Sequence, residues 1–412
     1  MFNAITNFLS QYPRLDERDP LPPQQLPIAL IVVVLGYFVG PGILQMWGVS
    51  YILLLLGAFR PYFTTGDVVT DYTQSSLFFV LLLSYLDHGI KTKNSPRYVG
   101  RSDKPLPNGG IGERGSKTWM EKLKWSLRLA TTPRGIGWNW QVKNVPSHPG
   151  ANQPRLEFVR DRVVELAWRM ALKALVVYIV GFCQAVQPSV TSPVTNWLFD
   201  AVVGWCGAAW SWHIIGIAHA AGGAITVLLG ICEPWEWPPV VGRLGDAWSV
   251  RQAWSTTYHQ TMRRTFQTPG VRLARFLSLK QGTLGSRYVQ LYIAFFISFC
   301  VHGWQSFTTT RRDNGEFAFF VSQPVIITIE DFVRWIWQKS VNPRQREKLA
   351  WLETLVGYVW TIIAFTVTLR PIMKGWTGIG LIGGGGPDEK AALQLGRQHG
   401  AVYLRTWQHL FA

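Results

Sequence analysis

Cysteine is scarce in this sequence and the histidines are scattered, which argues against several classes of metal protein. Four cysteines occur in 412 residues, and none has the spacing of a metal site or of a disulfide framework. All lie in or beside apolar runs and are expected to be buried free thiols: Cys183, Cys206, Cys232 and Cys300. A di-iron desaturase needs clustered histidines, whereas the eight histidines here are dispersed. No metal site is expected.

The sequence also lacks a secretory leader, a nucleotide-binding loop and an internal repeat. Residues 1–20 contain no basic stretch leading into an apolar one, so a cleaved signal peptide is not expected. The glycine-rich run 108–112 follows no predicted strand, and the run 378–386 lacks the Lys-Ser/Thr pair of a Walker loop. Both runs are expected to be flexible turns. The missing inverted repeat weakens the case for a transporter.

Acidic residues are outnumbered by basic ones, 24 to 40, which gives a net charge of +16. In a soluble protein this excess would favour nucleic-acid binding. Here the basic residues gather between apolar runs, as the positive-inside rule expects of cytosolic loops: 87–160, 233–286 and 339–350. No nucleic-acid partner is therefore expected. Such a face would instead attract anionic lipid headgroups and a polyphosphate ligand such as coenzyme A.

Apolar runs are abundant, since 48% of the residues are hydrophobic and 21 are tryptophan. Several runs reach the ~20 residues needed to cross a ~30 Å hydrocarbon core. Placing the basic segments on one side of a bilayer requires about eight crossings, at 27–44, 46–63, 75–86, 165–183, 197–232, 288–307, 317–338 and 351–369. The predicted fold is therefore all-α, a polytopic transmembrane helix bundle.

The membrane domain is expected over 27–370, between a polar N-terminal tail, 1–26, and a C-terminal tail, 371–412. Arg370-Pro371 is expected to stop the last crossing, because proline lacks the backbone N–H that a helix interior needs. The long run 197–232 fits either one tilted helix or two helices that break near Gly222-Gly223. Glu330 and Asp331 interrupt the apolar segment 317–338.

Two stretches combine a histidine with a distinctive setting. The first, 249–260, follows a Trp/Pro-rich run and ends in His259-Gln260, with a pair of arginines just beyond. The second, 292–303, is apolar and carries His302 inside a predicted membrane helix. An ionisable side chain at membrane depth suggests function. A neutral imidazole in a low-dielectric site keeps a lone pair for general-base catalysis.

With these two stretches the sequence resembles the wax-synthase-like branch of the membrane-bound O-acyltransferases, in particular the fungal members that acetylate terpenoid and meroterpenoid secondary metabolites. The family's first signature, Ser-Leu-x-x-Phe-Trp-Gly-x-x-Trp-His-Gln, is matched at the same spacing by Ser249, Trp254, His259 and Gln260. Its usual Phe and Gly are replaced by Ala253 and Ser255. The second signature, Phe-x-x-Ser-Gly-x-x-His, is matched by Phe295, Ser298 and His302, with Phe299 in place of Gly. The resemblance spans roughly residues 125–370 and includes 134–146, a stretch common in the fungal members.

The resemblance implies a role for each histidine. His302 corresponds to the family's embedded catalytic base, and Ser298 lies one helical turn before it, where its hydroxyl can fix the ring's tautomer. His259 stands where many relatives outside the wax-synthase branch carry Asn, so it would polarise the thioester carbonyl or position coenzyme A. The plainer interpretations are a packed intramembrane histidine and a solvated loop histidine.

The resemblance also suggests supporting residues in the signature region, 233–307. Trp254 and Gln260 would support His259, and Gln260 adds hydrogen-bond donors. Arg263 and Arg264 would hold the phosphates of coenzyme A, although an arginine pair is also what the positive-inside rule places in a cytosolic loop.

The implied activity is that of an acyl-coenzyme A-dependent O-acyltransferase in the endoplasmic reticulum membrane. The expected donor is acetyl-coenzyme A, the acceptor a hydroxyl of a hydrophobic terpenoid or meroterpenoid, and no bound cofactor is required. A wax-ester synthase would use a long-chain acyl donor and a fatty alcohol. A prenyltransferase or terpene cyclase would use Asp67 and Asp71 to hold Mg²⁺ and diphosphate, but a second acidic cluster is missing. A transporter would relay protons through His213, His219 and His302.

Overall fold

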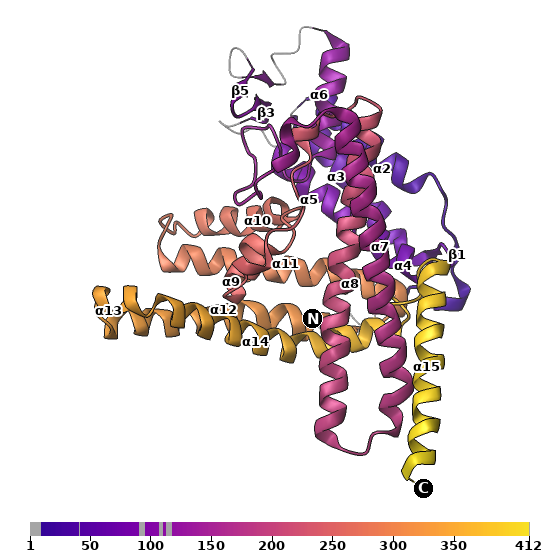
Figure 1. Cartoon of the computed structure of the whole chain (residues 1–412). Coiled ribbons are helices and arrows are strands. Elements are labelled where there is room, and N and C mark those ends of the chain that lie inside the picture. Colours follow the sequence, from indigo (N-terminus) through magenta and orange to yellow (C-terminus); the bar gives the residue numbers. More distant parts are fainter. Residues whose placement is uncertain (1–9, 41, 90–94, 107–109, 113–117, 412) are drawn as a thin grey trace. The chain divides into compact units, whose positions relative to one another are not determined.

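The computed structural model describes residues 10–40, 42–89, 95–106, 110–112 and 118–411, and within them helices dominate (Figure 1). The described strands form two-residue pairs: β1 (Asp19–Pro20) with β2 (Phe63–Thr64), β3 (Arg97–Tyr98) with β6 (Ile111–Gly112), and β4 (Gly100–Arg101) with β5 (Lys104–Pro105). This agrees with the all-α prediction. The chain divides into two compact units, each made of two segments. Unit 1 comprises Met1–Lys143 and Thr261–Asp313, and unit 2 comprises Asn144–Gln260 and Asn314–Ala412.

The first part of unit 1 is built around three apolar helices, α2 (Gln25–Val39), α3 (Ile43–Phe59) and α5 (Leu77–Gly89). Their buried side chains form one core with residues of α6 (Trp119–Thr131): Ala29, Val33, Tyr37, Val49, Leu53, Phe78, Leu82, Tyr85, Trp125 and Leu129. A Cβ at Gly36 would lie 2.7 Å from the Tyr85 ring, so glycine is needed there for close packing. The predicted loop 87–160 therefore contains a packed helix, α6.

The second part of unit 1 is a pair of helices, α10 (Arg263–Phe276) and α11 (Leu284–Thr310), which run side by side (Figure 1). A Cβ at Gly270 would lie 2.9 Å from the Cα of Gln290, so the two backbones approach closely at that glycine. The short helix α4 (Val68–Ser75) packs against α11. The side chain of Thr283 caps the start of α11 by accepting a hydrogen bond from the Ser286 N–H.

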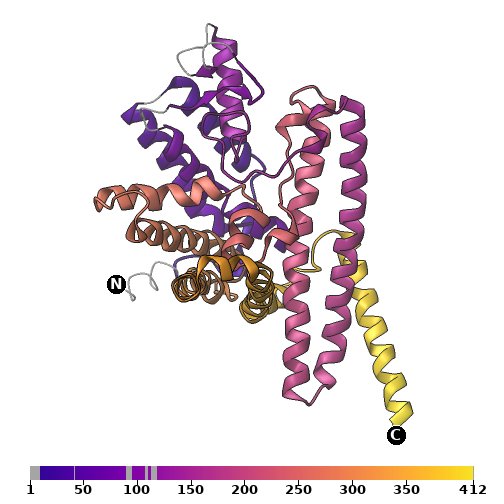
Figure 2. The same cartoon turned by 60° about the vertical axis from the view of Figure 1, so that its left-hand side comes forward.

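Unit 2 contains three long helices that lie side by side in both views, α7 (Arg155–Val186), α8 (Pro193–Leu228) and α15 (Pro387–Phe411) (Figures 1 and 2). Helix α8 is continuous, so of the two alternatives for this run the single helix is correct. A Cβ at Gly396 would lie 2.1 Å from the Tyr178 carbonyl oxygen, which shows how closely α15 approaches α7. The Lys173 ammonium also contacts Glu389 at 2.9 Å. The predicted C-terminal tail thus contains a packed helix.

Unit 2 also contains α12 (Glu316–Ser340), α13 (Pro343–Lys348) and α14 (Ala350–Gly378). Contrary to prediction, Arg370-Pro371 does not end the last apolar helix, and α14 runs through Pro371. Proline removes one backbone donor, and a long packed helix tolerates this loss when its neighbours hold it in place. Short 3-10 turns connect the main elements: η1 (Leu15–Glu17), η2 (Arg60–Tyr62), η5 (Pro149–Asn152), η6 (Gln187–Ser189), η7 (Pro234–Glu236) and η8 (Leu244–Asp246).

Four of the eight predicted crossings, 165–183, 288–307, 317–338 and 351–369, lie entirely within helices, and the other four run past a helix end. Within the described residues, four helices are long and apolar enough to span a bilayer. These are Ile43–Tyr62, Pro193–Leu228, Leu284–Thr310 and Ala350–Gly378. Helix α2 is apolar but has 15 residues, and α5 has 13, which is about 20 Å at 1.5 Å per residue. The cysteines are free, as expected, but only Cys183 and Cys206 are buried; Cys232 is half-buried and Cys300 exposed. Cys300 lies on an apolar helix whose outer face packs on no other part of the described unit, and for this reason the burial prediction failed there.

Candidate active site

The first signature forms a short helix in unit 2 whose start is fixed by polar contacts. The Ser249 side chain caps α9 (Val250–Gln252) by accepting a 3.0 Å hydrogen bond from the Gln252 N–H. The Val250 N–H donates to Glu330 Oε2 at 2.7 Å, and Arg251 forms an ion pair with Asp331. The two acidic residues that interrupt an apolar segment in the sequence therefore anchor the signature from α12.

A π-helical turn, η9 (Ala253–Thr257), follows α9 directly and ends just before the signature histidine. Such turns add a residue to a helix and recur at functional sites. The Trp254 indole N–H donates to Gln323 Oε1 at 3.0 Å. The buried Gln260 amide donates to the carbonyl oxygens of Trp254 (3.3 Å) and Tyr258 (2.8 Å). The structure thus brings Trp254 and Gln260 together, and both hold the backbone around His259.

His259 lies after this turn in irregular backbone and is half-buried. Its ring packs on Tyr258, with the ring centroids 4.5 Å apart, and Tyr258 in turn packs on Trp254 at 5.4 Å. The Tyr258 hydroxyl lies 3.2 Å from the Ser211 hydroxyl of α8. The half-buried ring packed on Tyr258 differs from that of a fully solvated loop histidine.

The second histidine, His302, lies in unit 1 on α11, where it is half-buried. Its Nδ1 lies 3.3 Å from the hydroxyl oxygen of Tyr72, on α4. In the described part of the chain no hydrogen bond joins Ser298 to His302, and the hydroxyl beside Nδ1 is that of Tyr72. Sequence reasoning missed Tyr72, because its partner is 230 positions away. A weak signal was its place beside Asp71, in a short polar stretch, 64–76, between two apolar runs.

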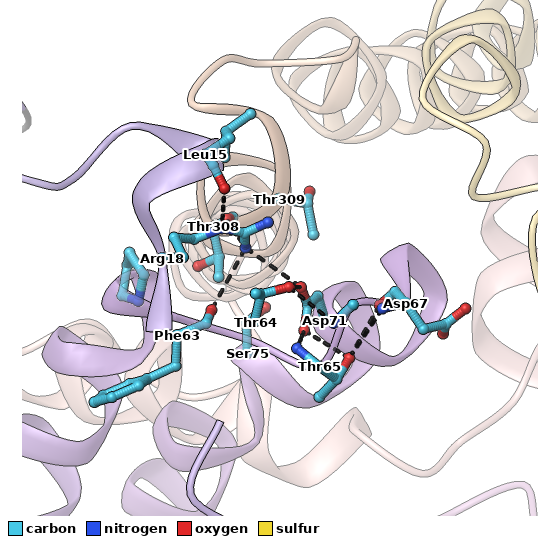
Figure 3. Close-up of polar contacts among 12 residues, drawn as sticks. Leu15, Arg18, Phe63, Thr64, Thr65, Asp67, Asp71, Ser75, Thr308 and Thr309 are labelled. Atoms are coloured by element: carbon cyan, nitrogen blue, oxygen red, sulfur yellow. Dashed lines mark hydrogen bonds and ion pairs between the residues drawn. The ribbon is translucent and has the colours of Figure 1, made fainter. Parts of the chain in front are cut away.

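Asp71 is the centre of a buried polar cluster (Figure 3). Its carboxylate accepts hydrogen bonds from Arg60 (3.0 Å), Arg18 (3.3 Å), Thr64 (2.6 Å) and the Thr65 N–H (2.8 Å). Burial alone would raise the pKa of Asp71, but these hydrogen bonds outweigh it and lower the pKa, so the carboxylate stays ionised.

The partners of Asp71 argue against the prenyltransferase alternative. Its neighbour Asp67 caps α4 by accepting a hydrogen bond from the Thr70 N–H at 2.7 Å. Both carboxylates are therefore used within the fold. In the described residues no group of three or more histidine, cysteine, aspartate or glutamate side chains is placed to hold a metal ion.

The two predicted coenzyme A-binding arginines lie at the start of α10 in unit 1. Arg264 forms an ion pair with Asp87, and its guanidinium lies 5.0 Å from the centroid of the Trp140 ring. Arg263 donates to the Lys143 carbonyl oxygen at 3.4 Å, and burial lowers its pKa. The ion pair with Asp87 gives Arg264 a structural role within unit 1.

The intramembrane histidines of α8 have aromatic neighbours. The His213 ring meets Trp168 edge-on at 5.9 Å, and the His219 ring meets Trp237 at 5.0 Å. His213 is also buried. These surroundings favour packing over a proton relay.

Comparison with known proteins adds to this geometry. The profile of the membrane bound O-acyl transferase family matches residues 237–322, which include both histidines. The chain is 29% identical over 380 residues to acetyltransferase ple2 of Rhodocybe pseudopiperita, covering 91% of this chain and 94% of that one. It is 29% identical to acetyltransferase eriL of Hericium erinaceus, covering 60% of this chain and 65% of that one. It is also 29% identical to O-Mevalon transferase yanI of Aspergillus niger, with coverages of 72% and 71%.

Proposed function

We propose that this chain, which belongs to the membrane-bound O-acyltransferase family, is an O-acetyltransferase that acetylates a hydroxyl of a hydrophobic terpenoid or meroterpenoid. The observation that carries the proposal is that the region matching the family profile contains both signature histidines, His259 and His302. The names of the relatives support acetyl as the transferred group. A lipid-soluble acceptor accounts for an enzyme that resides in a membrane.

The proposed reaction exchanges a thioester for an ester. The acceptor oxygen attacks the carbonyl carbon of acetyl-coenzyme A, the carbon–sulfur bond breaks, and the hydroxyl proton passes to His302. His302 then gives this proton to the coenzyme A thiolate, which leaves as the free thiol, so charge and atoms balance. His302 acts as general base, a role worth about 10²–10⁴-fold in rate. His259 donates a hydrogen bond to the thioester oxygen, where negative charge develops.

The activity is tested with membranes that contain the expressed chain. Acetyl-coenzyme A and farnesol, a terpenoid alcohol, serve as first probes, and palmitoyl-coenzyme A with hexadecanol tests the wax-ester alternative. We expect farnesyl acetate and release of free thiol, absent from membranes without the chain. Hexadecyl palmitate as the dominant product would overturn the acetyl assignment. No ester from any pair in a panel of terpenoid and fatty alcohols would overturn the proposed activity itself.

The role of His259 predicts unequal effects of two substitutions. His259→Asn keeps an N–H donor and should retain part of the activity, whereas His259→Ala removes the donor and should lose about 10²-fold or more in kcat. Kinetics of both variants in the same membranes decide the matter. Equal and near-normal rates would leave His259 without a catalytic role.

The two arginines should differ in their effects on the KM for acetyl-coenzyme A and on thermal stability. We expect Arg263→Ala to raise the KM for acetyl-coenzyme A about 10-fold, the loss of one charge-assisted hydrogen bond, with little change in kcat. Arg264→Ala should instead lower thermal stability, because it leaves the Asp87 carboxylate without this partner. If neither variant changes the KM, the phosphates are bound elsewhere.

We also propose that the chain crosses the endoplasmic reticulum membrane about eight times, with the segment 233–286 on the cytosolic side. Gln281 is exposed beyond α10, so Gln281→Cys offers a labelling site in a variant whose four native cysteines are replaced by serine. In sealed microsomes, whose cytosolic face points outward, a membrane-impermeant maleimide should label it without detergent. Labelling only after permeabilisation would mean that the segment 233–286 faces the lumen, opposite to the proposed topology.

A further inference from the structure

We propose that Tyr72 is a positioning residue for His302. In this assignment the phenol oxygen accepts a hydrogen bond from Nδ1–H, so that the lone pair of the imidazole resides on Nε2, where it receives the acceptor's proton. The inference rests on the proposed function, since it assumes that His302 is the base. The carrying observation is the 3.3 Å separation between the Tyr72 hydroxyl oxygen and His302 Nδ1. Such hydrogen bonds are often long before substrate binds and tighten afterwards.

Tyr72 is held rigidly enough for this role. Only 4% of it is exposed, and the preceding residue, Asp71, is fixed in the cluster of Figure 3. Arg18 joins α4 to α11 directly, because its Nη1 donates both to Asp71 Oδ2 and to the Thr308 carbonyl oxygen, each at 3.3 Å. A shift of α4 along α11 would therefore break either the ion pair of Arg18 with Asp71 or the hydrogen bond of Arg18 to Thr308.

A second connection lies on the other side of the tyrosine. The Gln305 amide of α11 donates to the Ser76 hydroxyl at 2.7 Å, and both side chains are buried. Gln305 lies one helical turn beyond His302 and Ser76 one turn beyond Tyr72. The links lie on either side of Tyr72 along α4, at Asp71 and Ser76, while on α11 both lie beyond His302, at Gln305 and Thr308. Gln305 is also a hydrogen-bond partner of the His302 ring. Such links between two helices hold a supporting contact at a defined distance.

The chemistry explains why this contact would favour reaction. When Nε2 takes a proton, the ring becomes cationic and the hydrogen bond from Nδ1 to the phenol oxygen becomes charge-assisted, about twice as strong as a neutral one. An interaction that is stronger in the transition state than before it raises kcat. The loss of the phenol oxygen should therefore appear in kcat, with little effect on the KM for acetyl-coenzyme A.

The main test compares two tyrosines that each lose one hydroxyl. Tyr72→Phe should lower kcat about 10- to 100-fold, while the KM for acetyl-coenzyme A stays within about twofold. Tyr37→Phe is the matched control, since Tyr37 is equally buried in unit 1 but donates to the Ser84 carbonyl oxygen. Equal rates for the two variants would overturn the inference. His302→Ala is measured alongside: if that variant stays active, the assignment of the base fails first, independently of Tyr72.

A second variant covers the case in which Tyr72→Phe does not fold. Replacing Tyr72 with 3-fluorotyrosine hardly changes its size but makes the phenol oxygen a poorer acceptor and a better donor. If the oxygen accepts from Nδ1–H, kcat should fall, measured at a pH where the phenol stays protonated. An unchanged or increased kcat would contradict the proposed direction of the hydrogen bond and overturn the inference.

Discussion

Replacement of His302 by alanine is expected to lower kcat by about 10²- to 10⁴-fold, while the protein still inserts into membranes at near-normal amounts. The reason is that the imidazole would receive the acceptor's proton in the transition state. Its removal takes away an interaction made in the transition state and not in the substrate complex, so the loss appears in kcat. Initial rates of ester formation, normalised to protein in the membrane, measure the effect.

The matched control for this experiment is His219→Ala. His219 also lies on an apolar helix and also packs against an aromatic ring, that of Trp237. It lies outside both signatures, so its removal should change the rate by less than about threefold. Full activity of His302→Ala would remove His302 from the mechanism. A similar large loss for both variants would point instead to a general effect on membrane folding.

Replacement of Asp71 by alanine should have the largest effect on stability, a loss of about 3–5 kcal/mol. The substitution leaves Arg60, whose side chain is fully buried, without its carboxylate at 3.0 Å. It also removes the hydrogen-bond acceptor of Arg18, Thr64 and Thr65. An uncompensated buried charge costs more than the pair itself contributes. The midpoint of thermal unfolding in a mild detergent, with the amount of protein recovered from membranes, measures the loss.

Asp67→Ala provides the comparison, because it removes a carboxylate from the same short helix but only an N-terminal cap. Such a cap is worth about 1 kcal/mol. The double variant Arg60→Met with Asp71→Leu should be more stable than Asp71→Ala alone, since no buried charge remains. If Asp71→Ala is no less stable than Asp67→Ala, the cluster does not stabilise unit 1 in the way described.

The helices of the eight apolar segments could be predicted from sequence, because hydrophobic runs of this length have few alternatives to helix in a membrane. Helix α15 could not, since it is polar overall and is held on α7 by contacts such as Lys173–Glu389 that join distant positions. The continuation of α14 through Pro371 was missed for a related reason. Proline usually ends a helix because it lacks a backbone N–H, but here packing against neighbouring helices keeps α14 helical.

In the candidate site, too, residues of one motif could be predicted from sequence, and residues brought together by packing could not. His259, Trp254 and Gln260 share one short stretch, so their spacing marked them together, and the structure joins the last two by a hydrogen bond. Tyr72 shares no motif with His302 and is brought to it only by the packing of α4 on α11. The arginine pair looked equivalent in sequence, but the structure pairs Arg264 with Asp87, a carboxylate that lies far away in the chain.

The interleaving of the two units has a consequence for how the chain is made. Unit 1 receives α10 and α11 only after the ribosome has passed through the segment 144–260, which belongs to unit 2. Until then the cluster around Arg60 and Asp71 lacks α11, the helix against which α4 packs. A premature stop at residue 260 would leave both units incomplete, and any single cut in the chain divides at least one of them. During synthesis, therefore, unit 1 can complete its core only after residue 313 has been made, and unit 2 only after the C-terminal segment has followed.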